Sequence, residues 1–584
     1  MQQKLKAVAP FAAVVLAALG LVAGPASAEA PPLPVAKSQS GNYLAALIAG
    51  ADRDTAAAAA YFREALKGDP LNADLMGRAF ASSLGSGEID KAALLADKFV
   101  LRDPHNSLVR LALAARAFSQ GQYGQARAHL AAGTAGRAHD VTSTMLTAWA
   151  YAGVRDERHA LESLDQITDK ALGVFKDFHA GLIADALGDA KEADKRLRSA
   201  YLGDKATLRF VDAYARALSR HGDLEGAKAV YAEYDKATPK HPLVEAALAD
   251  LAAGRKLEPI VRDAREGAAE ALYGLGGAGR GQGDELASLI YLRLSLYLRP
   301  DHDLAAATIA DLFEQNKQTA DEIVAYQMVP EKSPMRESAQ IQAATAMDSV
   351  GRNAEGLALM QKLVDARPKD VDAIVALADL QRSAKKFGEA AANYDLALAL
   401  IGEPSRVNWP LFYFRAICRE RLKQWPSAEA DFKKALSLFP DQPLVLNYLG
   451  YSWIDQGINL DEAFGMLRKA VSLKPDDGYI VDSLGWAHFK LAHFGDALGI
   501  MEKAVELKPA DPTVNDHLGD VYWRVGRRTE AVFQWNHARD MKPEPEDLPA
   551  ILKKIADGLP ELAAKATEPA APEPTPTETP KAGG

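Results

Sequence analysis

One pattern of apolar, small and turn-forming residues recurs about every 34 positions in the C-terminal half of the chain. Three blocks align on the pairs Leu449-Gly450, Leu484-Gly485 and Leu518-Gly519. After each pair come an aromatic position, a small residue, a bulky residue, a second small residue and a proline. This order predicts two helices per block, because a small residue lets the second helix approach the first and proline ends it.

The prolines keep this spacing over a longer stretch, at Pro300, Pro334, Pro368, Pro404, Pro440, Pro475, Pro509 and Pro543. Weaker blocks with the same phase occur earlier in the chain, where Ala58, Phe62 and Ala65 precede Pro70. A single helix pair cannot bury its own apolar face, so neighbouring pairs must share one continuous core. The pattern predicts an all-α solenoid of about 12 to 14 helix-turn-helix repeats in two arrays.

Breaks in the pattern divide the chain into segments. We expect a signal peptide at 1–28, a linker at 29–40, an N-terminal array at 41–239, an irregular joint at 240–283, a C-terminal array at 284–543, a capping helix at 544–565 and a disordered Pro/Thr/Glu tail at 566–584. Within the joint, Gly274 to Gly279 match G-x-G-x-x-G. The residues before them predict a helix, whereas a dinucleotide site needs a strand there. We therefore expect a flexible loop.

The first residues have the features of a secretory signal. Lys4 and Lys6 precede an apolar run from Phe11 to Ala23, and small residues lead to Ala28. We expect export to the periplasm with cleavage after Ala28. The alternative is an uncleaved membrane anchor, since the apolar run fits either. The single cysteine, Cys418, lies far from this point, so we expect no lipid anchor and a buried, unreactive thiol.

Charge and motifs argue against nucleic acid and catalysis. The formal net charge is −10, and no run of Lys and Arg forms the basic stripe that a phosphate backbone requires. The motifs H-E-x-x-H, G-x-S-x-G and the P-loop are missing from the sequence, as are paired cysteines. His488 holds the aromatic position of its block and His493 follows in a turn, so we expect packing or surface roles for both. We predict no enzyme activity, cofactor or metal site.

A protein partner would contact the free side of the first helix of each pair. In the three clearest blocks this predicts a contact set of Asn447, Tyr451, Asp455, Asp482, Trp486, Lys490, Asp516, Asp520, Trp523 and Arg524. Tyr and Trp often dominate interface energetics. The alternative for Trp486 and Trp523 is that they pack between helices, as buried aromatic residues do.

The repeated positions L-G-x-x-Y, A-x-x-x-F and P resemble the tetratricopeptide repeat (TPR) family along the chain up to about Pro543. The resemblance implies a right-handed superhelix that binds proteins. The runs from Leu446 to Tyr451, from Val481 to Trp486 and from Asn515 to Asp520 are similar to exported proteobacterial members of that family. Among these, the chain resembles the adaptor of a periplasmic carboxyl-terminal processing protease.

This resemblance implies a non-catalytic scaffold that brings an envelope protease or a peptidoglycan enzyme to its substrate. The alternative is a structural or assembly subunit of a pilus or polysaccharide secretion machine, which would reach the membrane only through partners. Two departures from the family matter. That adaptor resembles a lipoprotein, whereas this chain lacks the lipobox cysteine. Asp482, Asp516 and Asp520 are acidic where a carboxylate clamp has Lys, Arg and Asn, which favours a basic or extended aromatic-containing segment as the partner.

Overall fold

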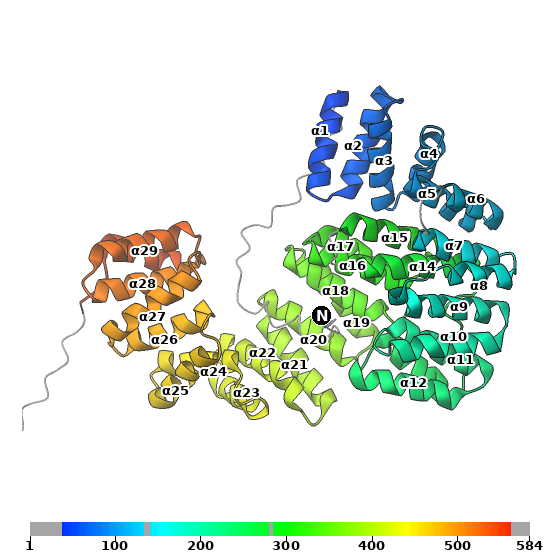
Figure 1. The fold of residues 1–584 in the computed structure, drawn as a ribbon. Coiled ribbons are helices and arrows are strands. Elements are labelled where there is room, and N and C mark those ends of the chain that lie inside the picture. Colours follow the sequence, from blue (N-terminus) through cyan, green and yellow to red (C-terminus); the bar gives the residue numbers. More distant parts are fainter. Residues whose placement is uncertain (1–37, 134–139, 280–283, 562–584) are drawn as a thin grey trace, which may run out of the picture. The chain divides into compact units, whose positions relative to one another are not determined.

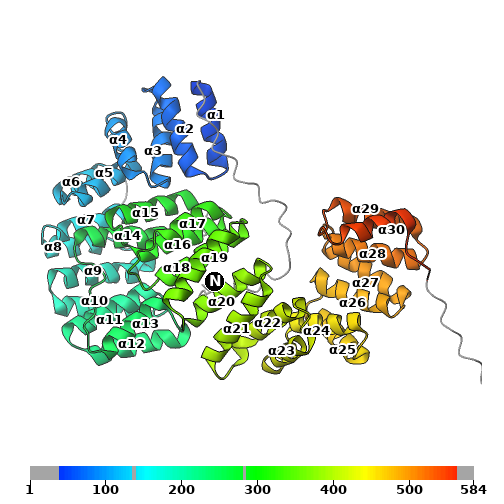
Figure 2. The same ribbon diagram turned by 180° about the vertical axis from the view of Figure 1, so that it is seen from behind.

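The computed structural model describes residues 38–133, 140–279 and 284–561, and the chain divides into two units, Met1–Ala384 and Lys385–Gly584. The described residues form helices and no strands, which confirms the all-α solenoid of helix pairs predicted above (Figures 1 and 2). The predicted signal peptide at 1–28, most of the linker and the tail at 566–584 lie outside the described residues.

The described part of unit 1 is a series of helix pairs with two single helices, α13 and α20. Its helices are α1 (Gln39–Ala51), α2 (Thr55–Gly68), α3 (Ala73–Gly85), α4 (Ile89–Phe99), α5 (Ser107–Ser119), α6 (Tyr123–Gly133), α7 (Val141–Ala152), α8 (Glu157–Asp165), the 3-10 helix η2 (Lys170–Leu172), α9 (Gly173–Leu187), α10 (Ala190–Gly203), α11 (Leu208–His221), α12 (Leu224–Ala237), α13 (Pro242–Ala252), α14 (Ala264–Ala278), α15 (Glu285–Leu298), α16 (Asp303–Gln315), α17 (Thr319–Gln327), α18 (Arg336–Ser349), α19 (Asn353–Ala366) and α20 (Val371–Ser383).

Polar residues fix where many of these helices begin. The side chains of Asp54, Asn72 and Asn106 accept hydrogen bonds from backbone N–H groups in the first turns of α2, α3 and α5. Such caps satisfy donors that have no partner inside the helix. The starts of these helices are therefore encoded locally.

The inner side of the N-terminal pairs is filled by α14 and α15. These two helices pack on α3, α5, α7 and α9, far from them in sequence (Figures 1 and 2). A Cβ atom on Gly267 of α14 would lie 2.2 Å from the ring of the fully buried Trp149 of α7. Buried apolar residues as far apart in sequence as Phe80 of α3 and Leu298 of α15 thus belong to one cluster.

The segment predicted as an irregular joint is different in the structure. Residues 240–283 include α13 and α14, and Gly274, Gly276 and Gly277 lie inside α14. The predicted flexible loop at this place is wrong. Two of these glycines serve close packing: a Cβ on Gly274 would lie 2.6 Å from the ring of Phe175, and one on Gly276 would lie 3.0 Å from Leu292. The division into units falls between Ala384 and Lys385 instead, because α14 and α15 join the N-terminal pairs in one core.

Over its described residues, 385–561, unit 2 contains a first single helix, four helix pairs and a final single helix. They are α21 (Phe387–Ile401), the 3-10 helix η3 (Arg406–Asn408), α22 (Trp409–Arg421), α23 (Trp425–Leu438), α24 (Pro443–Gln456), α25 (Leu460–Leu473), α26 (Gly478–Lys490), α27 (Phe494–Leu507), α28 (Pro512–Arg524), α29 (Arg528–Asp540) and α30 (Leu548–Asp557).

The repeated small and bulky positions form the core of unit 2. Ala463 and Leu467 of α25 are fully buried, as are Ala531 and Trp535 of α29. A Cβ on Gly519 would lie 2.5 Å from the Trp535 ring, so the glycine of this Leu-Gly pair lets the two helices touch. Cys418 is buried, as predicted.

Candidate protein-binding site

The ten predicted contact residues lie on α24, α26 and α28, which pack side by side. Nine of them fall in three rows, because each helix supplies the same positions relative to its Leu-Gly pair. The first row is Asn447, Asp482 and Asp516; the second is Tyr451, Trp486 and Asp520; the third is Asp455, Lys490 and Arg524. The structure divides these rows into a covered end and an accessible part.

The covered end lies on α28, where α30 supplies a cation. Lys554 Nζ lies 2.7 Å from Asp516 Oδ2 and 2.8 Å from Asp520 Oδ2. Trp535 Nε1 donates to the other oxygen of Asp520 at 2.9 Å, and Asp520 is only 4% exposed. Burial raises the pKa of Asp520 against the effect of Lys554. Asp516 and Asp520 are therefore internal partners of α30.

Trp523 and Arg524 are held by the residues that follow α30. A Cβ on Gly558 would lie 2.0 Å from the Trp523 ring, and that ring lies 5.4 Å from the Trp535 ring between centroids. Arg524 Nη1 donates to the carbonyl oxygen of Pro560 at 2.7 Å. The contact set is corrected accordingly: Asp516, Asp520, Trp523 and Arg524 already have partners within the chain, and Trp523 packs between helices.

The accessible part lies on α24 and α26. Lys490 Nζ is 3.0 Å from Asp455 Oδ1, and their side chains are 37% and 55% exposed. The same ammonium lies 5.9 Å from the centre of the Trp486 ring. Burial, with Asp455 and Asp482 nearby, raises the pKa of Tyr451 to about 12, so its hydroxyl stays protonated at neutral pH. These four residues offer aromatic surface beside paired charges.

A histidine that the sequence analysis missed holds this part together. His517 Nδ1 lies 3.0 Å from both carboxylate oxygens of Asp482, and the His517 ring stacks on Trp486 at 3.8 Å between centroids. Burial alone would lower the pKa of His517, but Asp482, with Asp516 and Asp520, raises it. Asp482 is 7% exposed, so it orients Trp486 through His517 more than it meets solvent. The 35-residue spacing of Asp482 and His517, one repeat apart, is the signal that could have found the pair.

Asn447 is the residue of the first row that lies on α24. Its Oδ1 atom is buried and has no hydrogen-bond partner among the described residues. A buried acceptor without a partner is costly. Asn447 therefore marks the least satisfied polar position of the accessible part.

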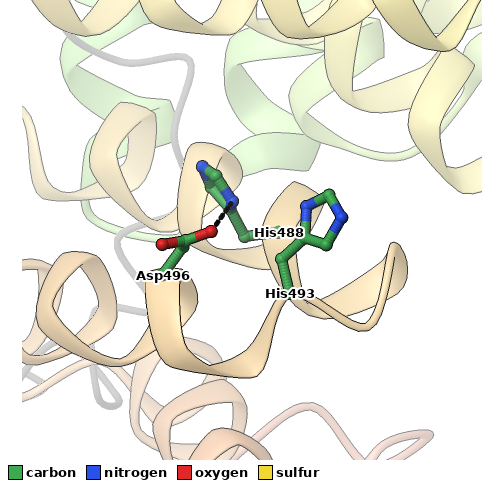
Figure 3. Close-up of side chains that lie close together, drawn as sticks. All are labelled: His488, His493 and Asp496. Atoms are coloured by element: carbon green, nitrogen blue, oxygen red, sulfur yellow. Dashed lines mark ion pairs between the residues drawn. The ribbon is translucent and has the colours of Figure 1, made fainter.

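A second group of polar side chains lies at the turn between α26 and α27. His488, His493 and Asp496 each place one potential ligand atom within 4.8 Å of the others (Figure 3). The sequence predicts packing or surface roles for the two histidines, and the structure brings them together with a carboxylate.

Comparisons with known proteins find similarity over only part of the chain. No family model matches the chain. A TPR repeat-containing protein of Pseudomonas aeruginosa is 29% identical over 196 residues, which is 33% of this chain and 32% of that protein. The chain thus matches about a third of the length of this curated relative.

Solved structures give further likenesses. A tetratricopeptide repeat protein from Parabacteroides merdae is 17% identical, with a TM-score of 0.37 over 43% of this chain and 98% of its own. Yeast Tom70 is 13% identical, with a TM-score of 0.31 over 89% of this chain and 95% of its own. TM-scores below 0.5 do not establish a shared fold, so the architecture rests on the helix pairs described above. None of the described helices is both long and apolar enough to cross a bilayer.

Proposed function

We propose that this chain is a non-catalytic scaffold that binds proteins through the first helices of unit 2. One observation carries the proposal: Tyr451, Asp455, Trp486 and Lys490 form an accessible aromatic and charged group on two adjacent helices. Aromatic side chains lose few torsions on binding, and Tyr and Trp are enriched among residues that dominate interfaces. His517 pairs with Asp482 and stacks on the Trp486 ring, so these two residues fix the orientation of that ring.

The setting that we propose is the bacterial periplasm. The support is the charged and apolar pattern of the first 28 residues, which is typical of an exported protein. In this setting the chain acts as an adaptor that brings an envelope protease or a peptidoglycan enzyme to its substrate. The resemblance to the adaptor of a carboxyl-terminal processing protease supports this choice. A structural subunit of an envelope machine is the second candidate, favoured by the length of the array, since stacked repeats present long surfaces.

Affinity capture from an envelope extract tests the scaffold. We would compare the full chain with the double variant Tyr451→Ala, Trp486→Ala, and with Phe533→Ala as a matched control. Phe533 is an aromatic residue on a second helix and is 59% exposed. Recovery of a protease or peptidoglycan enzyme by the wild type and the control, and not by the double variant, supports the adaptor.

The affinity for the recovered partner then gives a magnitude. Loss of two interface aromatics should weaken binding by about 2 kcal/mol or more, or roughly thirtyfold. Equal affinity of the double variant and the control would contradict the site. Capture of membrane machinery by all three proteins would favour the structural subunit.

A further inference from the structure

The turn between α26 and α27 brings together two imidazoles and a carboxylate. His488 is near the end of α26, His493 is the first residue before α27, and Asp496 lies in the first turn of α27. His488 Nδ1 is buried, has no hydrogen-bond partner among the described residues and lies 3.9 Å from Asp496 Oδ2, too far for a hydrogen bond (Figure 3). The two histidines are joined by a backbone hydrogen bond of 2.9 Å from His493 N–H to the carbonyl oxygen of His488, and their ring centroids lie 6.0 Å apart.

The next repeat fills the same three positions with a ring, a cation and a carboxylate. Tyr522, Arg527 and Glu530 are the equivalents of His488, His493 and Asp496. The Arg527 guanidinium lies 4.2 Å from the centre of the Tyr522 ring, and its Nε is 3.0 Å from Glu530 Oε1. A positive charge thus sits between the ring and the carboxylate.

The same cation and carboxylate positions are paired in two further repeats. Arg352 and Glu355 begin α19 with a separation of 2.8 Å, and Lys386 and Glu389 begin α21 with a separation of 3.5 Å. At the start of α27 the cationic residue is replaced by His493, whose side chain makes no capping hydrogen bond. Asp496 supplies the carboxylate there, as Glu530 does in the next repeat. His488 stands in the place of Tyr522, and its Nδ1 atom has no hydrogen-bond partner among the described residues.

We propose that His488, His493 and Asp496 bind a divalent transition-metal ion, with Zn²⁺ as the best fit. The ion takes the place that the guanidinium of Arg527 has in the next repeat. Two imidazole nitrogens and one carboxylate oxygen are a ligand set that Zn²⁺ prefers, and three protein ligands leave one tetrahedral position for water or a partner side chain.

The required rearrangement is small. Ligand bonds of about 2.0–2.1 Å in a tetrahedron place ligand atoms about 3.4 Å apart. The three atoms lie within 4.8 Å of one another. Asp496 is 72% exposed and His493 is exposed, so both side chains are free to turn inward, while His488 is held edge-on against the ring of Phe464. Arg468 is the cation whose charge acts on His488, and it opposes binding.

Titration of the full, untagged chain with ZnCl₂, followed by calorimetry, tests the site. We expect one ion per chain with a dissociation constant in the micromolar range, and a tenfold or larger loss of affinity in His488→Phe, His493→Ala and Asp496→Asn. A Co²⁺ titration should show the visible absorption bands of a tetrahedral ion in the wild type and in none of these three variants.

Two controls separate this site from scattered surface binding. His537→Asn removes an exposed histidine of α29 and should leave the affinity unchanged. The triple variant His488→Tyr, His493→Arg, Asp496→Glu copies the set of the next repeat, so it should stay folded and bind no ion. Absence of binding by the wild type up to 1 mM Zn²⁺, about a thousandfold above the expected range, would overturn the proposal. Unchanged binding in the triple variant would do so too.

Discussion

The first helix of each helix pair meets different surroundings in the two units. In unit 1, α3, α5, α7 and α9 pack against the chain's own α14 and α15. In unit 2, α24 and α26 keep exposed charges at Asp455 and Lys490, whereas α28, the first helix of the last pair, is covered by α30. The same repeat therefore serves as a core in one unit and leaves an accessible face in the other.

The composition of the first helices accounts for this difference. In α5, eight residues from Val109 to Phe118 are buried, including neighbours on all sides of the helix. A helix that is apolar all round belongs in an interior. In α24 the free side instead carries Asn447, Tyr451 and Asp455. The number of apolar sides on a first helix thus distinguishes a repeat that is covered from one that can receive a partner.

The sequence predicts the helix pairs and their cores well, because small and bulky residues at fixed spacing specify local packing. Ala463, Leu467, Ala531 and Trp535 are all buried as the pattern requires. It does not predict which distant segment returns to cover a face. Gly267 looks like a weak helix residue until Trp149 is placed against it.

In the candidate site, too, the sequence predicts the repeated positions but not the segment that covers them. Its three rows follow from the period, but the loss of Asp516 and Asp520 to Lys554 depends on where α30 docks. The apolar residues of α30 predict a helix there, with Ile551 buried. They do not specify that its lysine reaches the acidic positions of α28.

Removal of Glu270 is the strongest way to break the filled core of unit 1. Glu270 of α14 is 1% exposed and forms two hydrogen bonds with Arg209 of α11, at 2.8 and 2.5 Å. Glu270→Ala removes the closest partner of the buried Arg209 and leaves it the longer contact with Asp212, at 3.4 Å, which should cost about 3–5 kcal/mol. Urea unfolding, with hydrogen exchange of α11 and α14, measures this loss. The control is Glu162→Ala, which removes one partner of the exposed pair with Arg158 and should change neither the free energy of unfolding nor the hydrogen exchange. Equal losses of stability in both variants would contradict the expected difference between a buried and an exposed ion pair.

A pair of glycine substitutions within α14 tests close approach directly. Gly267→Ala places a methyl group 2.2 Å from the Trp149 ring and should destabilise unit 1 by about 1–3 kcal/mol. Gly277→Ala meets no atom within 4 Å and should be neutral or stabilise by up to about 1 kcal/mol, because alanine favours helix. Thermal unfolding of both variants compares them. Equal destabilisation by Gly277→Ala would mean that the loss in Gly267→Ala does not report its close approach to Trp149.

Substitution of Lys554 should turn the covered end of unit 2 into an accessible one. Lys554→Ala removes the cation between Asp516 and Asp520, which should loosen α30 by about 1.5 kcal/mol. Faster hydrogen exchange in α30, together with greater quenching of tryptophan fluorescence by acrylamide as Trp523 becomes exposed, would report the release. Lys553→Ala is the control, since Lys553 is exposed. Equal exchange in both variants would show that the apolar contacts of α30 suffice to hold it.

The smallest expected effect is a pH dependence of the accessible part, which comes from His517. Because Asp482 and its neighbours raise the pKa of His517 in the folded state, the bond between them stabilises the fold fully below about pH 6.5, the ordinary value for histidine. This stabilisation is lost as the pH rises through the raised folded value. Hydrogen exchange of α26 and α28 between pH 6 and 9 should therefore converge for the wild type and His517→Gln at high pH. A difference that stays constant or grows with pH would mean that His517 acts through its stacking on Trp486 and not through its charge.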